Sequence, residues 1–378
     1  MWFAPFLCIG LMVVGLLRPL PKFTVPEHYR AVVDAEGTKV PIEEPFRGTI
    51  LISLDAGGYL EITKSPDTLT YAGGTVDRSW FGKEFMSRIY PQVLQRGSLW
   101  DPQMIRHGHG PYAELESILA SDGGAYLGSS GDLVPLLRRV GLPALYTNTG
   151  KEKDENESEF VWASVVTSLI GHPDRGAAVI AHYQQAFTDI ASDLNESTLP
   201  NRPRVLVMGA ESHEKQNKTP NIRSLYIKST ANPYQLYILR AGATNASEGW
   251  TSEQPEAERI LAMDPDFIFL MWWGQDPQEF MHDPRWRGLR AVRERRVYRL
   301  PGNPGGGGLM GLIFQPISVR WMAEIVHPDR LQPKTRQVMR DTYLREFGYR
   351  MSDKEIDEQL QMNVNQPQPD YGRFARNY

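Results

Sequence analysis

Residues 256–270 read EAERILAMDPDFIFL, and residues 113–131 repeat the same design roughly 140 residues earlier, with AELESILA leading into GGAYLGSSG. In each copy an amphipathic helix that carries a glutamate, Glu116 or Glu258, leads into a buried strand. Each strand opens into a polar loop, which contains Ser129 and Ser130 in the first copy and Trp272, Trp273 and Gln275 in the second. Two related α/β units on one chain predict two lobes that face each other across a cleft.

Length and composition agree with two soluble domains. The 378 residues exceed what one hydrophobic core normally holds. The chain is 41% hydrophobic and 23% charged, with a formal net charge of −4. This balance excludes a nucleic-acid-binding surface, which would need a strong basic excess.

Residues 1–17 contain no charged residue and are rich in apolar side chains. The stretch is short for a membrane span and has the length of the apolar part of a secretory signal. We therefore expect export to the periplasm, with residues 1–24 as a signal peptide. A membrane anchor or a misassigned start codon is the alternative, because no basic residue precedes the run and no A-x-A site follows it. Cys8, the one cysteine, lies in this stretch, so an exported chain would hold no thiol.

The N-terminal lobe is expected over residues 25–156. Residues 25–40 are polar and turn-rich and are interpreted as a lead-in segment. Residues 48–54 predict a buried strand, and strand-like and helix-like runs alternate up to residue 147, which predicts a parallel sheet. Residues 151–159 are interpreted as a charged linker.

Residues 157–198 are expected to connect the lobes through two consecutive helices, over residues 160–170 and 174–194. The second helix is long, and a long helix is a stiffer connector than a glycine-rich hinge. The residues predicted to form its apolar sector are Ala178, Ile180, Ala181, Tyr183, Phe187, Ile190, Ala191 and Leu194.

The C-terminal lobe is expected over residues 199–327, with residues 205–208 as its first strand. A helical tail follows over residues 328–378, in which Ser352 to Glu355 has the pattern of a helix start. Residues 366–378 are expected to fray. The predicted fold class is α/β: two lobes, each a twisted, mainly parallel sheet with helices, joined by one long connecting helix and followed by a helical C-terminal tail.

Ligands of open α/β sheets bind beyond the carboxyl ends of the strands. That rule selects eight segments as the lining of the predicted cleft: residues 55–59, 106–112, 128–131, 147–149, 209–215, 245–250, 271–275 and 302–310.

Two histidines share the segment Arg106 to Gly110. An H-x-H pair such as His107 and His109 can offer two ring nitrogens to a transition metal. Possible further ligands from the other lobe are Glu211, His213 and Glu214. The alternative is that both histidines are polar surface residues in a glycine-flanked loop.

Trp250, Trp272 and Trp273 are candidate ligand-binding residues. Successive strand side chains point to opposite faces, so Trp272 and Trp273 cannot both enter one core. An aromatic wall suits a planar or aryl-bearing ligand such as a catecholate siderophore, a porphyrin or a quinone. The alternative is a tryptophan packed under the edge of its domain.

Asn303 begins a proline- and glycine-rich turn whose backbone N–H groups could approach an anionic ligand. The turn is no phosphate loop, because no Lys-Ser/Thr follows, and an ordinary flexible turn is the alternative. Cations that could neutralise ligand carboxylates are Arg106, Arg223, Lys228 and Arg240.

Over roughly residues 45–360, the chain resembles the substrate-binding proteins of bacterial ABC importers for iron-siderophores, haem, cobalamin and other metal chelates. The resemblance rests on the repeated helix–strand segments, on DPRWRGLRAVRERRVY at residues 283–298 and on YLREFGYRMSD at residues 343–353. It implies a ligand held between two lobes and a small closing motion about one long helix. In vitamin B12-binding relatives one glutamate per lobe docks on arginines of the permease, and the matching positions are Glu116 and Glu258. Ordinary solvated helix glutamates are the alternative.

We therefore expect a periplasmic solute-binding protein that captures a metal chelate, foremost an iron-siderophore, and delivers it to an ABC permease powered by a separate ATPase. Haem, a corrinoid or a planar polycarboxylate or quinone cofactor are alternative ligands. Haem is less favoured because no single tyrosine or histidine stands out as its axial ligand. The chain is expected to be a monomer without an intrinsic cofactor or a nucleic-acid partner.

No enzyme motif competes with this interpretation. Residues 128–131 lack the G-x-S-x-G spacing, and neither H-E-x-x-H nor a dinucleotide fingerprint occurs. The alternative from another class is a two-lobed metal-dependent enzyme that uses His107 and His109. A third hypothesis is a sensor or scavenger, which would bind the same ligand without needing Glu116 and Glu258.

Overall fold

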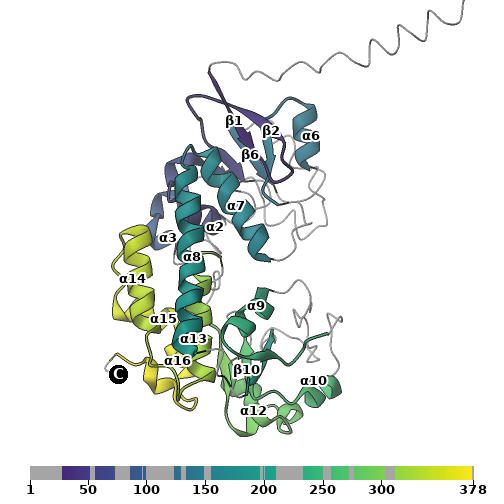
Figure 1. Ribbon diagram of the computed structural model, residues 1–378, viewed down its shortest axis with the longest axis vertical. Coiled ribbons are helices and arrows are strands. Elements are labelled where there is room, and N and C mark those ends of the chain that lie inside the picture. The colour runs from purple at the N-terminus through teal and green to yellow at the C-terminus, as the bar shows by residue number, and fades with distance from the viewer. Residues whose placement is uncertain are drawn as a thin grey trace, which may run out of the picture.

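Two parallel sheets form the framework of the protein, as the computed structural model shows (Figure 1). The structure describes residues 28–51, 56–72, 86–95, 97–98, 123–128, 133–148, 155–195, 199, 201–209, 233–249, 257–271, 276–302 and 311–376. Within these ranges the sheet of the first lobe (the N-lobe) has the strand order β5-β4-β3-β6-β7, and the sheet of the second (the C-lobe) has the order β11-β10-β8-β9. All neighbouring strands in both sheets run parallel, as the sequence predicted.

The strands of the N-lobe are short and buried. They are β3 (Thr49–Leu51), β4 (Leu69–Ala72), β5 (Gly97–Ser98), β6 (Ala125–Gly128) and β7 (Ala144–Tyr146). Ile50 and Tyr126 pack with α6 (Leu133–Arg139), whereas Leu51 and Leu127 join the main core with α2 (Ala56–Thr63). Helices therefore cover both faces, which explains why these strands are continuous apolar runs. The remaining short helices are α3 (Met86–Ile89), η1 (Pro66–Thr68) and η3 (Pro91–Gln95).

The interpretation of residues 25–40 as a lead-in segment is wrong for its described part. β1 (Tyr29–Val33) and β2 (Lys39–Glu43) form an antiparallel hairpin. The buried Asp34 carboxylate closes the turn by accepting the backbone N–H groups of Glu36 and Thr38, at 3.0 and 2.9 Å, and it pairs with Arg138. The sequence signal for this hairpin is a short turn with an aspartate and a glycine between two valine-containing runs.

The C-lobe sheet consists of β8 (Arg204–Met208), β9 (Thr244–Asn245), β10 (Phe267–Leu270) and β11 (Val297–Arg299). Its helices are α9 (Pro233–Arg240), α10 (Ala257–Met263), α11 (Pro277–His282), η7 (Pro284–Trp286) and α12 (Arg290–Arg293). The second copy of the repeated unit is confirmed as α10 followed by the buried β10. Of the first copy, β6 is confirmed, and the helix predicted over residues 113–120 lies outside the described residues.

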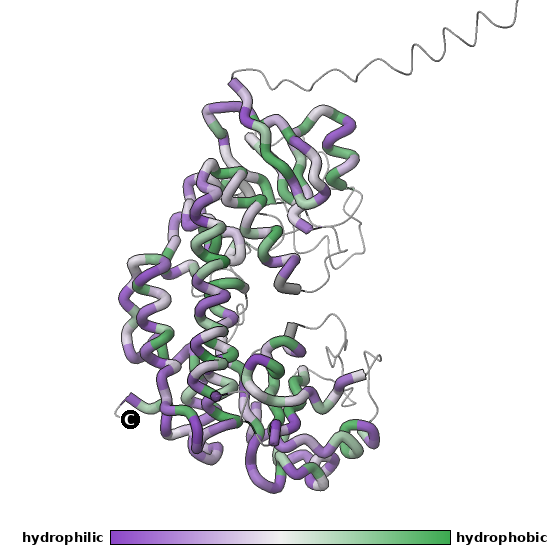
Figure 2. The backbone as a smooth tube through the Cα atoms, viewed as in Figure 1, coloured by the Kyte–Doolittle hydropathy of each residue, from purple (hydrophilic) through white to green (hydrophobic). Residues whose placement is uncertain are grey.

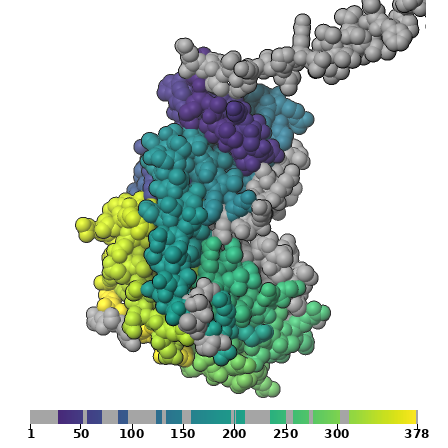
Figure 3. All heavy atoms as spheres, viewed as in Figure 1, coloured from purple at the N-terminus to yellow at the C-terminus, as the bar shows by residue number. Residues whose placement is uncertain are grey.

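Two consecutive helices connect the lobes, as predicted: α7 (Glu155–Leu169) and the 22-residue α8 (Pro173–Leu194). Figure 3 shows these residues as a teal column that runs along one side of the molecule from lobe to lobe. The charged linker was predicted too long, because α7 already begins at Glu155. The predicted apolar sector of α8 was also partly wrong: Ala178 and Ala181 are exposed. The buried residues are Gly176, Val179, Tyr183, Ile190 and Leu194, in steps of three, four and seven residues.

The C-terminal helices extend beyond the C-lobe. α13 (Gln315–Val326) is buried along its whole length and packs against α8, α9 and α14 (Thr335–Phe347). α14 lies on the outside and is largely purple, hence hydrophilic, in Figure 2. The predicted helix start at Ser352 is confirmed: its hydroxyl and the Glu355 carboxylate form a capping box at α15 (Asp353–Gln359). α16 (Met362–Asn365) and η8 (Tyr371–Phe374) follow.

The chain end is more ordered than the sequence predicted. Residues 366–376, which were expected to fray, pack onto the C-lobe with Tyr371 and Phe374 each only 1% exposed. Trp321 donates its indole N–H to the Tyr371 hydroxyl at 3.0 Å, and Arg373 donates to the Glu324 carbonyl at 3.0 Å. Buried aromatic side chains on and beside the short η8 hold this segment in place.

Candidate functional site

The carboxyl edge of the C-lobe sheet faces the N-lobe. α13 begins beside the N-lobe, where the backbone N–H of Ile313 donates to Glu61 of α2 at 2.6 Å. Its other end, Val326, lines a pocket of about 360 Å³ together with Pro203, Phe267 and Arg296, which lie at the amino ends of the C-lobe strands. Since the amino ends lie at the far end of α13, the carboxyl ends point toward the N-lobe.

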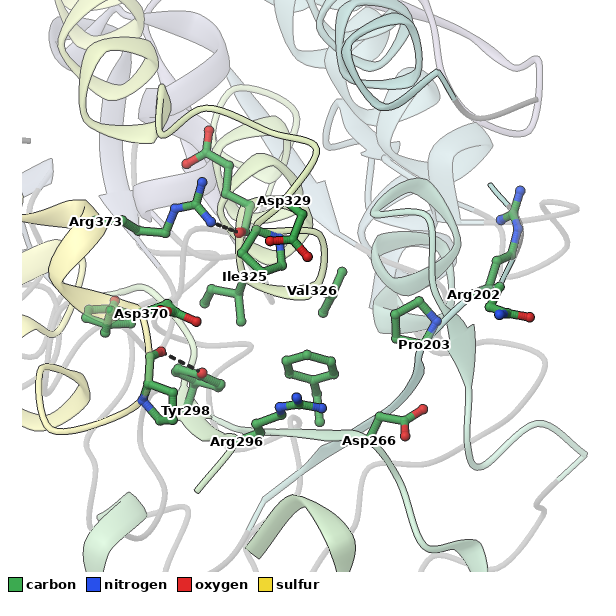
Figure 4. A pocket seen from close by; sticks show the side chains of 16 residues that line it. Arg202, Pro203, Asp266, Arg296, Tyr298, Ile325, Val326, Asp329, Asp370 and Arg373 are labelled. Atoms are coloured by element: carbon green, nitrogen blue, oxygen red, sulfur yellow. Dashed lines mark hydrogen bonds between the residues drawn. The ribbon is translucent and has the colours of Figure 1, made fainter. Parts of the chain in front are cut away.

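Figure 4 shows that far pocket from close by. The guanidinium of Arg296 lies 5.1 Å from the centre of the Phe267 ring, and the Tyr298 hydroxyl donates to the Pro369 carbonyl at 3.1 Å. The pocket lies at the edge of the sheet opposite to the predicted cleft, so it is no part of the interlobe site.

The carboxyl edge of the N-lobe sheet faces the C-lobe in the same way. α7 ends at Leu169 beside the hairpin, where the Leu169 carbonyl accepts a hydrogen bond from Arg30 at 2.8 Å. It begins at Glu155 on the side toward the C-lobe (Figure 1). β7 ends at Tyr146, shortly before α7 begins, and Thr147 then donates from both its N–H and its hydroxyl to the Gly128 carbonyl. Two parallel sheets thus present to each other their carboxyl edges, the edges at which open α/β sheets bind ligands.

The ligand-binding residues predicted from the sequence belong to segments that follow strands in the chain. All of them lie outside the described residues, and they stay predictions: Arg106, His107, His109, Ser129, Ser130, Trp250, Trp272, Trp273, Gln275 and Asn303. The same holds for Arg223 and Lys228.

The prediction that residues 55–59 line the cleft is wrong at Tyr59. This side chain is fully buried, and its hydroxyl is hydrogen-bonded to the hydroxyls of Thr49 and Thr68, at 2.9 and 2.8 Å. Burial raises the pKa of Tyr59 to about 12, against the opposing effect of these two hydrogen bonds. The buried side chains of α2, including Tyr59, therefore pack in the core of the N-lobe and do not line the cleft.

The segment predicted to follow β9 at the cleft, residues 245–250, is also placed differently where it is described. β9 pairs with Arg204 and Val205, the first two residues of β8. Ala246, Ser247 and Glu248 therefore line a surface pocket with Arg204, near the amino edge of the sheet. The two-residue strand is too short to carry this segment to the carboxyl edge.

Arg240 was a candidate for neutralising a ligand carboxylate, and it is turned toward the connecting helix. Its guanidinium lies 3.9 Å from the centre of the Phe187 ring and donates to the Tyr183 hydroxyl at 2.5 Å. Tyr183 in turn donates to Gln315 of α13 and receives Phe160 of α7 edge-on, with ring centres 5.5 Å apart. This cluster joins both lobes behind the facing edges.

Arg299 is a cation at the carboxyl end of β11 that the sequence interpretation did not select. Burial lowers the pKa of its guanidinium, and the carboxylates of Asp276 and Glu279 oppose that effect. Asp276 also caps α11 by accepting the backbone N–H of Gln278 at 2.7 Å. The edge of the C-lobe therefore has a partly buried positive charge with two acidic neighbours.

Glu159 is a carboxyl group on α7, one turn from the end that faces the C-lobe. Burial raises its pKa to about 7. No hydrogen bond or ion pair to Glu159 occurs in the described part of the chain. An uncompensated carboxylate of this kind changes its charge near neutral pH.

Glu61, which links α2 to the segment before α13, was not selected from the sequence. It lies inside the mainly apolar helix AGGYLEIT. Besides Ile313, its carboxylate contacts Gly311, where an added Cβ would come within 2.5 Å of Oε2. Gly311 also has a φ of +89°, so no other residue fits there without strain. A single carboxylate in an otherwise apolar helix is the signal that could have identified it.

No group of three or more His, Cys, Asp or Glu side chains suited to a metal ion occurs within the described ranges. His107, His109, Glu211, His213 and Glu214 all lie outside those ranges, so direct metal ligation stays a prediction. Of the two proposed docking residues, Glu258 is exposed in the first turn of α10, and Glu116 lies outside the described part.

Comparison with known proteins shows which family the chain is similar to. The sequence profile of the family described as "Periplasmic binding protein" matches residues 122–304, just under half of the chain. The expected resemblance to periplasmic binding proteins is thereby confirmed. No sequence among the curated proteins matches this chain.

Solved structures of binding proteins share the fold. A periplasmic solute binding protein from Veillonella parvula superposes with a TM-score of 0.68 at 17% identity, over 89% of this chain and 98% of that one. The molybdate periplasmic binding protein MolA of Haemophilus influenzae gives 0.64 at 14%, over 85% and 99%. CeuE of Helicobacter pylori, in a Ni–His complex, gives 0.60 at 15%, over 88% and 99%.

The predicted fold class, α/β with two lobes, is thereby confirmed. No helix among the described residues has the length and apolarity that crossing a bilayer requires.

Proposed function

We propose that this chain is the periplasmic solute-binding component of an ABC importer and that it captures a metal chelate between its lobes. An iron-siderophore is the ligand proposed first. The observation that carries the proposal is the arrangement of the sheets, whose carboxyl edges face each other, in a chain similar to this family. Capture is followed by delivery to the permease, and ATP hydrolysis by another subunit supplies the energy.

The ligand class is supported by what related structures contain. MolA is described with molybdate and CeuE with Ni–His, so each of these relatives holds a metal in a small complex. In this chain, the candidate ligand-binding side chains combine flat aromatic surfaces (Trp272 and Trp273) with polar and cationic groups. Such a surface suits a chelate with aryl or planar parts.

Delivery is proposed to use one glutamate on each lobe, Glu116 and Glu258. Glu258 is exposed on α10, as a docking residue must be. Complementary arginines on the permease would fix the orientation of the loaded protein and raise its rate of association. A sensor or scavenger would bind the ligand equally well after both glutamates are replaced, and its biological activity would persist.

Native mass spectrometry of the protein purified from the periplasm, combined with its visible absorption spectrum, tests the ligand class. A bound mass with an iron–catecholate or iron–hydroxamate band is the expected result. Trp272→Ala and Trp273→Ala should then weaken binding, and Trp286→Phe, at a buried site in the C-lobe core, should leave it unchanged.

Two other outcomes would contradict the proposal in different ways. A metal ion without an organic ligand, lost on His107→Ala and His109→Ala, would indicate direct metal binding and support the metalloenzyme alternative. A coloured organic molecule without metal would indicate uptake of a cofactor.

A further inference from the structure

One short segment of the C-lobe is unusually basic for an acidic protein. Residues 285–296 contain six arginines and one acidic residue, Glu294, in a chain with a formal net charge of −4. The segment runs through η7, α12 and the approach to β11. Charge of one sign on one part of a surface creates a local field that the net charge of the protein conceals.

Three of the six arginines are neutralised by nearby carboxylates. Arg285 pairs with Asp283, which also caps η7. Arg290 pairs with Asp264 and Asp266, and Arg296 pairs with Glu294 at 2.8 Å. These pairs fix the fold of the segment and leave little field outside it.

The other three, Arg287, Arg293 and Arg295, form what we call the arginine patch. Each is exposed, and within the described ranges none has a carboxylate partner. Among the described residues, Arg293 donates to the Gly288 carbonyl, next to Arg287, and Arg295 donates to the Pro367 carbonyl at 3.3 Å. Backbone carbonyls carry no formal charge, so these contacts do not neutralise the two guanidinium groups. Three exposed positive charges within nine residues leave a local positive field that an anionic partner would meet.

The arginine patch is continuous with α10. An added Cβ at Gly288 would lie 3.6 Å from Leu261 Cδ2, so the turn that carries Arg287 packs on this helix. Figure 1 shows α10 and α12 together at the end of the C-lobe. α10 carries Glu258, the proposed docking residue, so the face that meets the permease also brings the arginine patch toward the membrane.

We propose that the arginine patch binds anionic phospholipid headgroups of the membrane around the permease. Three guanidinium groups match phosphate in charge and in hydrogen-bond geometry. Binding would hold the C-lobe at the membrane surface and orient α10 toward the permease. The direction of this face rests on the proposed importer function, whereas binding to lipid does not require a permease or a ligand.

Co-sedimentation of the full chain with lipid vesicles tests this inference. The vesicles contain one part phosphatidylglycerol to two parts phosphatidylcholine, or phosphatidylcholine alone, and the measured quantity is the ratio of the two partition coefficients. Each arginine near an anionic surface contributes about fivefold to binding. The variant with Arg287→Gln, Arg293→Gln and Arg295→Gln should therefore lower the ratio by roughly a hundredfold.

A matched control removes three positive charges elsewhere. Lys39→Gln, Arg139→Gln and Arg350→Gln lie on the hairpin, on α6 and after α14, and all three side chains are exposed. This control should change the ratio only slightly. Any binding through the apolar residues 1–17 would be common to both kinds of vesicle and to every variant, so the ratio isolates the contribution of charge.

Salt sharpens the test, because the Debye length falls from about 10 Å at 0.1 M to about 3 Å at 1 M. The preference for anionic vesicles should disappear at the higher concentration. An equal ratio for the patch variant and the control, or a wild-type ratio near one at low salt, would overturn the proposal. Neither result would bear on Glu258, whose role is measured separately by transport with the reconstituted permease.

Discussion

The two lobes are joined in two places whose chemistry differs. In the connecting-helix joint, Tyr183 of α8 packs with Phe160 of α7 and is bonded to Arg240 of α9. In the C-terminal joint, Glu346 of α14 pairs with Lys64, which follows α2, and Arg88 of α3 donates to Glu358 of α15 at 2.9 Å. The first joint depends mainly on aromatic packing and the second on ion pairs.

This difference predicts how each joint responds to solution conditions. Aromatic contacts depend little on pH or salt. Ion pairs at a partly exposed surface weaken when acid protonates the carboxylate and when salt screens the charges. Acid or salt should therefore loosen the C-terminal joint first, while α8 continues to hold the lobes. A second tie of this kind should also restrict the motion of the lobes, and the resemblance to the family likewise predicts a small closing motion.

The buried network between the end of α8, α13 and the start of α14 should be the most sensitive to substitution. Arg320, on α13, donates to Glu324 at 2.6 Å and pairs with Asp193 at the end of α8. Glu324 also accepts the hydroxyl of Thr335 at 2.7 Å. We expect Glu324→Ala to lower the free energy of unfolding by about 3–5 kcal/mol, because a buried arginine loses its partner. Urea denaturation measures this.

The exposed pair of Arg296 and Glu294 provides the control. Glu294→Ala should cost less than about 1 kcal/mol. Equal costs for the two variants would contradict the importance assigned to burial.

Glu159, on α7 of the connecting-helix joint, should make that joint less stable at high pH. Burial raises the pKa of its carboxyl group from 4.5 to about 7, so folding disfavours the charged form. The penalty is absent below pH 4.5, grows as the pH rises and is complete above pH 7. Glu159→Gln should therefore stabilise the protein at pH 8 by about 3 kcal/mol and have no effect at pH 4.

Thermal unfolding across this pH range measures the effect. Glu157→Gln, at an exposed position of the same helix, should change the stability by less than about 0.5 kcal/mol at every pH. A stabilisation by Glu159→Gln that does not depend on pH would contradict the assigned cause.

The hydroxyl of Tyr183 should contribute less, and independently of pH. Tyr183→Phe keeps the ring against Phe160 but removes the hydroxyl that donates to the buried Gln315, whose Oε1 is then left with a 3.4 Å contact from Arg240. We expect a loss of about 2 kcal/mol, as for a buried group left poorly satisfied. Tyr29→Phe on the hairpin, whose hydroxyl has no partner among the described residues, is the control and should be close to neutral. A loss that becomes smaller as salt is added would show that the joint is ionic.

The smallest effect is expected at Glu346 in the C-terminal joint. Burial alone would raise the pKa of Glu346, but hydrogen bonds from Lys64 and Arg345 outweigh it and hold the pKa below 4.5. Its contribution to stability is therefore complete above pH 4.5 and is lost as the pH falls through the lowered pKa. Glu346→Gln should cost about 1 kcal/mol at pH 7 and nothing in strong acid. A cost unchanged down to pH 2 would show that the charge is unimportant.

The framework of both lobes could be predicted from local patterns. The buried runs at residues 48–54 and 267–270, the capping box at Ser352 and the long α8 each follow from short-range rules. The repeated helix–strand unit then led from these elements to a two-lobed architecture. Each of these features depends on neighbouring residues, which is why a single sequence reveals it.

The features that were missed depend on contacts between distant segments. Glu61 acts on Gly311 and Ile313, some 250 residues further on. Tyr371 is held by Trp321, and β9 is positioned by its pairing with the start of β8. No periodicity encodes such partners. Of the candidate site, the sequence identified the facing strand ends, whereas the turn of Arg240 toward α8 required the structure.

Hydrogen–deuterium exchange with and without the chelate identified by mass spectrometry tests whether the ligand lies between the facing edges. Protection is expected in both lobes, at residues adjoining the carboxyl strand ends such as Thr147, Gly209 and Met271. The pocket at the amino ends, around Phe267 and Arg296, should be unchanged. Protection confined to one lobe, or centred on that far pocket, would contradict it.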